Sequence, residues 1–268
     1  MRTSDLPSFE APPVSETLLG VEFAPLARWR IPHFGLFWHL IRDEYPRCDV
    51  KPSLAPQDEV FGEQSVPPLA RRIQLEFLQQ PEVRCWFQDS GESRLLQVQS
   101  DRFIHNWRKQ PSLDVYPRYG QVRSRFETEW MRFQEFLAAE KLGPATVAQC
   151  EVTYVNHFER GREWASLSDL SKVVTFWNGT SATHPDPESV ETVMSFVRGS
   201  TRLRVQLQHA MRRDLTEIVS FSLSARGRPG GGQPKHILQW MDEARSWIVN
   251  SFAELTTPAM HQLWKRRS

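Results

Sequence analysis

The chain has 268 residues, of which 40% are hydrophobic and 24% are charged, and this composition is typical of folded globular proteins. Its 33 basic and 32 acidic residues give a net charge of +1, which excludes a strong overall attraction to nucleic acid or to anionic membranes. No stretch approaches the ~18 apolar residues that a membrane-spanning helix needs, and three scattered cysteines indicate reduced thiols. We therefore expect a cytoplasmic protein with no membrane partner, and the oligomeric state stays open.

The first half, residues 15–145, is expected to form one lobe that follows a flexible lead of residues 1–14. Apolar residues alternate with others over 19–23, which predicts a half-buried strand. Apolar residues at helical spacing over 34–45 predict a helix with one buried face. The five prolines over 46–70 indicate an irregular loop.

Three further strands are expected in this half, at 71–78, 83–88 and 94–108. An apolar stripe then predicts a long helix over 121–141, which ends at a glycine followed by a proline. The turns between the strands are too short for crossover helices, so the strands are expected to pair antiparallel.

The second half, residues 146–268, is expected to form a similar lobe. Its elements follow the same order of strand, helix, strands and long helix. They are expected at 151–157, 167–177, 191–198, 201–210, 217–225 and 236–255, with a last short helix after Thr257. The fold class that follows is α+β, with a duplicated strand–helix–strands–helix unit and an antiparallel sheet backed on one face by helices.

The alternation of residues within the strands predicts that the second face of the sheet is polar. Leu203 and Val205 would face the helices, while Arg202 and Arg204 would lie on the open face. Two arginines on an open face could contact phosphates, so a nucleic-acid interface at Arg202 and Arg204 is an alternative function.

Known catalytic signatures are missing from the sequence. It contains no Gly-x-Ser-x-Gly turn, no phosphate-binding loop and no dinucleotide fingerprint. The eight histidines show no spacing typical of metal ligands. We therefore expect no catalytic residue, no cofactor and no metal.

One group of residues stands out as a candidate ligand site. It combines arginines and aromatic rings at the end of a strand with a segment that directly precedes the long helix 121–141, where backbone N–H groups are free. Arg108, Arg118 and the helix start near Gly120 could bind an anion or a nucleotide base. A structural role also stays open, in which the Arg118 guanidinium binds backbone carbonyls. The candidate residues are Asn106, Trp107, Arg108, Tyr116, Arg118 and Tyr119, with Tyr154 and Asn156 facing them from the second half.

The same segments carry a resemblance to a known family. They include Asn106-Trp107-Arg108, Tyr116-Pro117-Arg118-Tyr119, the strand 150–157 and the ending 255–264. Together they resemble a sporadically distributed family of uncharacterised bacterial proteins of similar length. The resemblance implies a bacterial, full-length single unit with patchy occurrence, as if carried on mobile DNA, and it implies no activity. The order of elements also resembles the duplicated domains of the TATA-binding-protein-like fold, at the level of fold alone.

The function expected from these observations is that of a non-enzymatic binding or regulatory protein, an accessory of a bacterial mobile or defence element. Its partner would be a protein or a nucleotide-like molecule. Nucleic-acid binding through the polar sheet face is the alternative. A third possibility is an unrecognised enzyme that acts on a phosphorylated small molecule at the joint between the halves.

Overall fold

The structure, a computed structural model, forms one continuous antiparallel sheet of nine strands in the part of the chain that it describes. The order of the strands across the sheet is β2-β3-β4-β5-β1-β6-β9-β8-β7. The mixed α+β class and the antiparallel sheet are therefore confirmed. The described residues are 6–55, 59–61, 83–110, 115–178 and 183–267, and the strand expected at 71–78 lies outside them.

The first half contains five strands and two long helices among its described residues. In chain order they are β1 (Val14–Phe23), α1 (Ile31–Ile41), β2 (Arg47–Pro52), β3 (Val83–Gln88), β4 (Arg94–Gln99), β5 (Arg102–Arg108) and α2 (Tyr119–Ala139).

Two expectations for this half were wrong. The segment expected to be an irregular loop contains β2, which pairs with β3 along its whole length. Pro52 ends β2 at the edge of the sheet, where a missing N–H does not interrupt the ladder of hydrogen bonds. Residues 94–108 form a hairpin and not one strand, because the chain reverses between Gln99 and Arg102.

The second half follows the expected order, with β6 longer than expected and its short helix a 3₁₀ helix. The elements are β6 (Val147–Glu159), η3 (Leu167–Lys172), β7 (Glu191–Arg198), β8 (Thr201–Met211), β9 (Glu217–Gly227), α3 (Pro234–Leu255) and α4 (Pro258–Leu263). The hydroxyl of Thr257 accepts a hydrogen bond from the Met260 N–H and so caps α4, as the sequence indicated.

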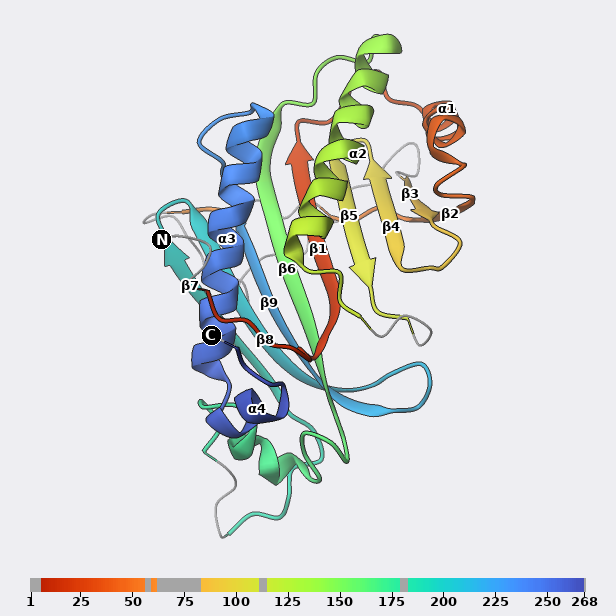
Figure 1. The fold of residues 1–268 in the computed structure, drawn as a ribbon. Helices are drawn as coiled ribbons and strands as arrows, with labels where there is room; N and C mark the ends of the chain where they lie inside the picture. Colours follow the sequence, from red (N-terminus) through yellow and green to blue (C-terminus); the bar gives the residue numbers. More distant parts are fainter. Residues whose placement is uncertain (1–5, 56–58, 62–82, 111–114, 179–182, 268) are drawn as a thin grey trace.

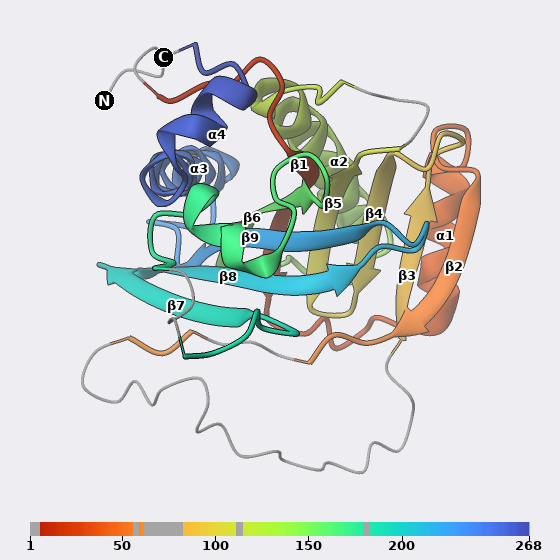
Figure 2. The same ribbon diagram turned by 90° about the horizontal axis from the view of Figure 1, so that it is seen from below.

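The long helices lie on one face of the sheet (Figures 1 and 2). α2 crosses the strands of the first half and α3 those of the second, while α1 packs beside α2 at the β3 end. On the opposite face, a described part of the chain, residues 53–55 and 59–61, runs beneath the strands (Figure 2). The sheet therefore has a helix-covered face and a polar face, as its alternating sequence predicted.

Aromatic rings fill the space between the sheet and the helices. Phe133 of α2 contacts Phe37 and Phe103, with ring centroids 5.4 and 5.1 Å apart, and all three rings are fully buried. In the second half, Phe158 stacks on Trp264 with centroids 5.3 Å apart. The apolar stripes of the strands and helices thus build one core.

The two halves meet where β1 pairs with β6 at the centre of the sheet. In this register Thr17 of β1 lies opposite Trp107 of β5 on one side and opposite Tyr154 of β6 on the other. The two expected lobes therefore share one sheet. The superposition of their backbones remains a prediction.

The segment that precedes β1 is bound to the other end of the chain. The N–H groups of Glu10 and Ala11 donate to the carbonyls of Lys265 and Trp264, and the Arg267 N–H donates to the Ser8 carbonyl. Residues 6–13, expected to be a flexible lead, thus lie against the C-terminal segment and cross the lower part of α3 (Figure 1).

Candidate functional site

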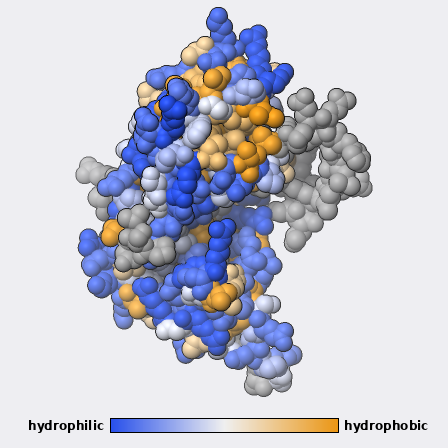
Figure 3. Space-filling view, turned by 90° about the vertical axis from the view of Figure 1, so that its right-hand side faces the viewer, coloured by the Kyte–Doolittle hydropathy of each residue, from blue (hydrophilic) through white to orange (hydrophobic). Residues whose placement is uncertain are grey.

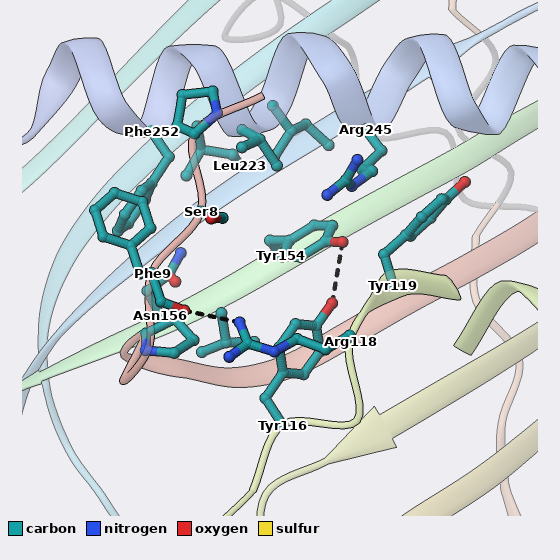
Figure 4. A pocket seen from close by; sticks show the side chains of 15 residues that line it. Ser8, Phe9, Tyr116, Arg118, Tyr119, Tyr154, Asn156, Leu223, Arg245 and Phe252 are labelled. Carbon is teal, nitrogen blue, oxygen red and sulfur yellow. Dashed lines mark hydrogen bonds between the residues drawn. The ribbon is translucent and has the colours of Figure 1, made fainter. Parts of the chain in front are cut away.

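A cavity of about 140 Å³ lies on the helix-covered face, at the joint between the two halves. Its walls come from the N-terminal segment, from the residues that lead into α2, from β6 and β9, and from α3 (Figure 4). We call it the terminal pocket. Its apolar walls include Phe9, Val14, Leu223, Ile248 and Phe252, and its polar groups are on Ser8, Tyr116, Arg118, Tyr119, Tyr154, Asn156 and Arg245.

Two tyrosines form the polar floor of the terminal pocket. The Tyr116 ring lies against Trp107, with centroids 5.1 Å apart, and its hydroxyl donates to the Tyr154 hydroxyl over 3.1 Å. Burial is the main cause that raises the pKa of both tyrosines above the ordinary value of 10.0. Both phenols therefore keep their protons near neutral pH and can act as neutral hydrogen-bonding groups.

Arg118 holds the N-terminal segment at the pocket. Its guanidinium donates to the carbonyls of Phe9 and Glu10 over 2.8 and 3.2 Å. Its backbone has φ 71° and ψ 151°, a region that almost only glycine occupies. A residue with a side chain is strained there by about 1–3 kcal/mol. The first turn of α2 thus begins from a strained residue whose side chain reaches the chain terminus.

Arg245 is the cation that faces the interior of the terminal pocket. It extends from α3 toward the Tyr154 hydroxyl (Figure 4) and lies 5.0 Å from the centre of the Tyr119 ring. Its Nε is buried and has no hydrogen-bond partner among the described residues. A buried guanidinium N–H without an acceptor is unfavourable, so the site is suited to a ligand that supplies one.

An acidic side chain of the same helix is engaged by other groups. Asp242, one turn before Arg245 on α3, accepts hydrogen bonds from the Tyr119 hydroxyl and from Arg123 Nε over 2.7 and 2.9 Å. Burial and the Asp242 charge raise the pKa of Tyr119 well above its ordinary value. Among the described residues that line the pocket, none is acidic, so the pocket has an excess of positive charge.

Five of the eight residues predicted for the ligand site line this one pocket. They come from the segment before α2 and from β6, and they are Tyr116, Arg118, Tyr119, Tyr154 and Asn156. Trp107 lies behind them through its contact with Tyr116. The Arg118 guanidinium is bound to carbonyls, as in the structural role that the sequence left open.

The structure does not bring Asn106 and Arg108 to this pocket. Both side chains lie on the polar face of the sheet, where they bind Glu16 Oε1 over 2.5 and 3.1 Å. Asn106 also accepts a hydrogen bond from Gln97. Alternation along β5 sends Trp107 to one face and its two neighbours to the other, so the three residues cannot act as one cluster.

Sequence reasoning missed Arg245. Ala244 and Ile248 belong to the buried stripe of α3, and Arg245 sits beside that stripe, where a charged residue ordinarily reaches solvent. An arginine at the border of an apolar stripe is a weak signal. Arg245 is recognised as a pocket residue only from the structure, in which the N-terminal segment and α3 together line the cavity.

The arginines of the polar face are mostly paired with carboxylates. Arg202 binds Glu59 over 2.6 Å and the Val60 carbonyl over 2.9 Å, whereas Arg204 is exposed. Other pairs on this face are Arg102 with Glu22, Arg226 with Glu151 and Arg108 with Glu16. The two residues predicted for a nucleic-acid interface thus lie on a face whose charges largely cancel.

A buried glutamate of α2 links the helix to two other segments of the first half. Glu129 of α2 accepts a hydrogen bond from the Tyr45 hydroxyl, and its second oxygen lies 2.6 Å from His105 Nδ1. The side chains of Glu129 and His105 are each 2% exposed. The carboxylate holds the His105 imidazole in one orientation. His105 also borders an open groove beside α2.

An apolar surface lies at the other end of the molecule. Figure 3 views the side where α1 lies and shows apolar side chains gathered in its upper part. Ile31, Leu36 and Leu40 of α1 are 64%, 47% and 56% exposed. α1 is therefore apolar on its outer side as well as on its buried side, which is uncommon for a surface helix.

The described helices include none that is long and apolar enough to cross a membrane. In the same part of the chain, no three His, Cys, Asp or Glu side chains gather into a group that could hold a metal ion. Comparison with models of protein families finds no match to this chain, and comparison with curated proteins finds none either.

Proposed function

We propose that this chain is a binding protein whose ligand is a small anion held in the terminal pocket. The proposal rests on Arg245, whose buried Nε lacks an acceptor among the described residues and whose side chain extends into a cavity without acidic walls. An anion there would accept hydrogen bonds from the guanidinium and from the tyrosine hydroxyls at the floor.

Binding is favoured over catalysis by the chemistry of the walls. The described lining residues include no His, Cys, Lys, Asp or Glu, which are the usual proton donors, acceptors and nucleophiles of enzymes. The tyrosines are held protonated by burial, which removes them as bases near neutral pH. The pocket can orient and desolvate a ligand, and its described lining residues offer no base that is ready to take a proton from it near neutral pH.

The position of the pocket supports a regulatory role. The N-terminal segment forms part of its wall, and this segment is held by Arg118 and by residues 264–267 of the C-terminal segment. A ligand could therefore change how firmly the termini are held, which a protein partner would detect. The association with a mobile or defence element stays a prediction, and it would be tested by the genes that lie beside this one.

The duplication of the fold belongs to the same proposal. Apart from β2, which has no counterpart among the described elements of the second half, β1, α1, β3 to β5 and α2 follow the same order as β6, η3, β7 to β9 and α3. The first strand of each half lies at the centre of the sheet. A duplicated unit would create a joint at β1 and β6, and joints of this kind are common ligand sites. Superposing the two half-backbones tests this point.

The experiment for the function compares thermal melts of the full chain with and without small anions. Inorganic phosphate, acetate and benzoate are suitable probes. At least one should raise the melting temperature of the natural chain and leave that of Arg245→Met unchanged, because methionine keeps most of the side-chain volume without the charge. Equal shifts in both proteins, or none in either, would show that the pocket does not bind anions through Arg245.

A further inference from the structure

We infer that the ligand of the terminal pocket is a monocarboxylate whose apolar body is about the size of one six-membered ring. This inference rests on the proposed function and names the class of its ligand. Three properties of the pocket lead to it, namely its volume, its charge and the composition of its walls.

The volume sets the size of the ligand. An apolar protein cavity of about 150 Å³ holds one benzene ring. The terminal pocket has about 140 Å³, so one ring or a compact branched chain fits, while a nucleoside or a two-ring system does not fit entirely inside. A larger molecule would either leave part of its apolar surface in solvent or displace the N-terminal segment that Arg118 holds at the pocket.

The charge sets the anionic group. One guanidinium, that of Arg245, has an unused buried N–H, and Arg118 is already committed to two carbonyls. Arg118 keeps its positive charge but uses its N–H groups on the two carbonyls, so one guanidinium is left to bind the anionic group directly, and one carboxylate is enough to occupy it. The planar fork of arginine matches a carboxylate with two parallel hydrogen bonds.

The walls set the body of the ligand. Phe9 and Phe252 meet edge to face, with centroids 5.6 Å apart and planes at 85°, on the side of the pocket away from Arg245. Leu223 and Ile248 add aliphatic surface beside them. A ring placed between these groups would bury its apolar surface while its carboxylate reached Arg245 and the Tyr154 hydroxyl. The ligand is thus expected to be amphipathic along its length.

The test is isothermal titration calorimetry on the full chain with benzoate, benzamide, 2-naphthoate and inorganic phosphate as probes. Benzoate has about nine non-hydrogen atoms, and ligands of this size bind with Kd between roughly 1 mM and 1 μM. Benzamide keeps the shape and lacks the charge, so it should bind at least about tenfold more weakly. Phosphate and 2-naphthoate should show no binding in the same range.

Two variants connect binding to the pocket. Arg245→Met should lower benzoate affinity by at least about tenfold, and Tyr154→Phe should lower it several-fold because it removes one hydrogen bond. Arg213→Met is the matched control, since Arg213 is exposed in the turn between β8 and β9 and does not line the pocket. A melting curve for each variant confirms that it is folded.

The outcomes separate this inference from the proposed function. If phosphate binds in an Arg245-dependent manner and the carboxylates do not, the ligand class is wrong and the anion-binding function stands. The inference is also overturned if benzamide binds as well as benzoate. If none of the anions binds, or if Arg245→Met binds them all unchanged, both the ligand class and the proposed function are wrong.

Discussion

The two faces of the sheet use arginine in opposite ways. On the polar face, Arg102 is almost fully buried and lies 3.0 Å from Glu22, and most of its neighbours have carboxylate partners as well. On the helix-covered face, Arg245 extends into the terminal pocket, whose described lining residues include no carboxylate. The Nε atoms of Arg102 and Arg245 are both buried without an acceptor among the described residues, so the carboxylate partner is what distinguishes the two residues. The difference separates a charge that stabilises the fold from a charge that is available to a ligand.

Arg84 is an arginine of the polar face whose hydrogen-bond partner is not a carboxylate. Its guanidinium donates to the neutral amide of Gln97 and lies over the Trp86 ring. Burial, together with the nearby charges of Arg102 and Arg108, lowers its pKa. The Nε of Arg84 is also buried without an acceptor among the described residues, so Arg245 differs from Arg84 by its place in a cavity with mostly apolar walls.

The largest effect is expected from Arg102→Met. The substitution leaves Glu22 in a mostly buried site without its cation, and breaking a buried ion pair in this way destabilises proteins by about 3–5 kcal/mol. Urea unfolding at neutral pH measures the loss. The double variant with Glu22→Gln serves as the control, because it removes the stranded charge and should recover much of the stability. An Arg102→Met protein as stable as the natural chain would contradict the structural role of this pair.

The destabilisation by Arg102→Met should also depend on pH. Burial is the main cause that raises the pKa of Glu22 above 4.5, and loss of Arg102 removes the chief opposing influence. A carboxyl with a raised folded pKa stabilises the fold fully below its unfolded pKa, and this stability is lost as the pH rises through the folded pKa. The difference between variant and natural chain should therefore be smaller at pH 4 than at pH 7 in the same unfolding experiment.

A smaller effect is expected at Arg118, where strain and hydrogen bonding can be separated. Arg118→Ala removes two hydrogen bonds to the N-terminal segment and should lower the free energy of unfolding by about 1–3 kcal/mol. Arg118→Gly loses the same bonds but relieves the strain at φ 71°, so it should be about 1 kcal/mol more stable than the alanine variant. Equal stability of the two variants would show that the backbone at Arg118 is not strained.

Asn106→Ala provides a comparison on the polar face. The Asn106 amide links Gln97 and Glu16, and the residue is 1% exposed. Removing it leaves buried groups without a partner, which should lower the free energy of unfolding by about 1–3 kcal/mol. Denaturant unfolding beside the Arg118 variants checks this. If Asn106→Ala were fully stable and lost benzoate binding instead, the assignment of Asn106 to the polar-face network would be wrong.

The smallest effect is expected for nucleic acids. Most polar-face arginines are neutralised by carboxylates, and Arg202 is bound to Glu59, so affinity for duplex or single strands should be weak. Any binding should fall steeply with salt, with a log–log slope of about −0.9 per duplex phosphate contacted. Mobility shifts at two salt concentrations measure it. Tight binding that weakens steeply with salt, and that Arg204→Gln reduces, would instead favour the nucleic-acid function.

The sequence predicted most of the fold because the patterns that it contains are local. Apolar alternation in 201–208 and the stripes of α2 and α3 follow directly from the geometry of strands and helices. β2 was missed because Pro46 and Pro52 indicate a loop, and an exposed edge strand needs no apolar alternation. The order of strands, with β1 and β6 adjacent at the centre, comes from pairing over long chain distances that local patterns do not encode.

The site was predicted in part for the same reason. Tyr116, Arg118 and Tyr119 are close in sequence and stay together, and Tyr154 joins them because β1 pairs with β5 on one side and with β6 on the other. Arg108 was grouped with them through its position in the chain, although strand alternation directs it to the other face. Arg245 lies 126 residues after Tyr119 in the chain, and the two meet only because α2 and α3 lie side by side over the joint.

The most direct test of the account is one set of thermal melts on the natural chain, Arg245→Met and Arg102→Met, each with and without saturating benzoate. The account predicts that the two variants differ in opposite ways, one in ligand response and the other in stability. Arg245→Met should melt close to the natural chain without ligand and lose the benzoate-induced rise, because the described lining residues give this charge no carboxylate partner and the variant loses only a contact with the Tyr119 ring. Arg102→Met should melt well below the natural chain and keep the rise. The reverse pattern, with Arg245→Met strongly destabilised and still stabilised by benzoate, would show that the unpaired arginine holds the fold and does not bind the ligand.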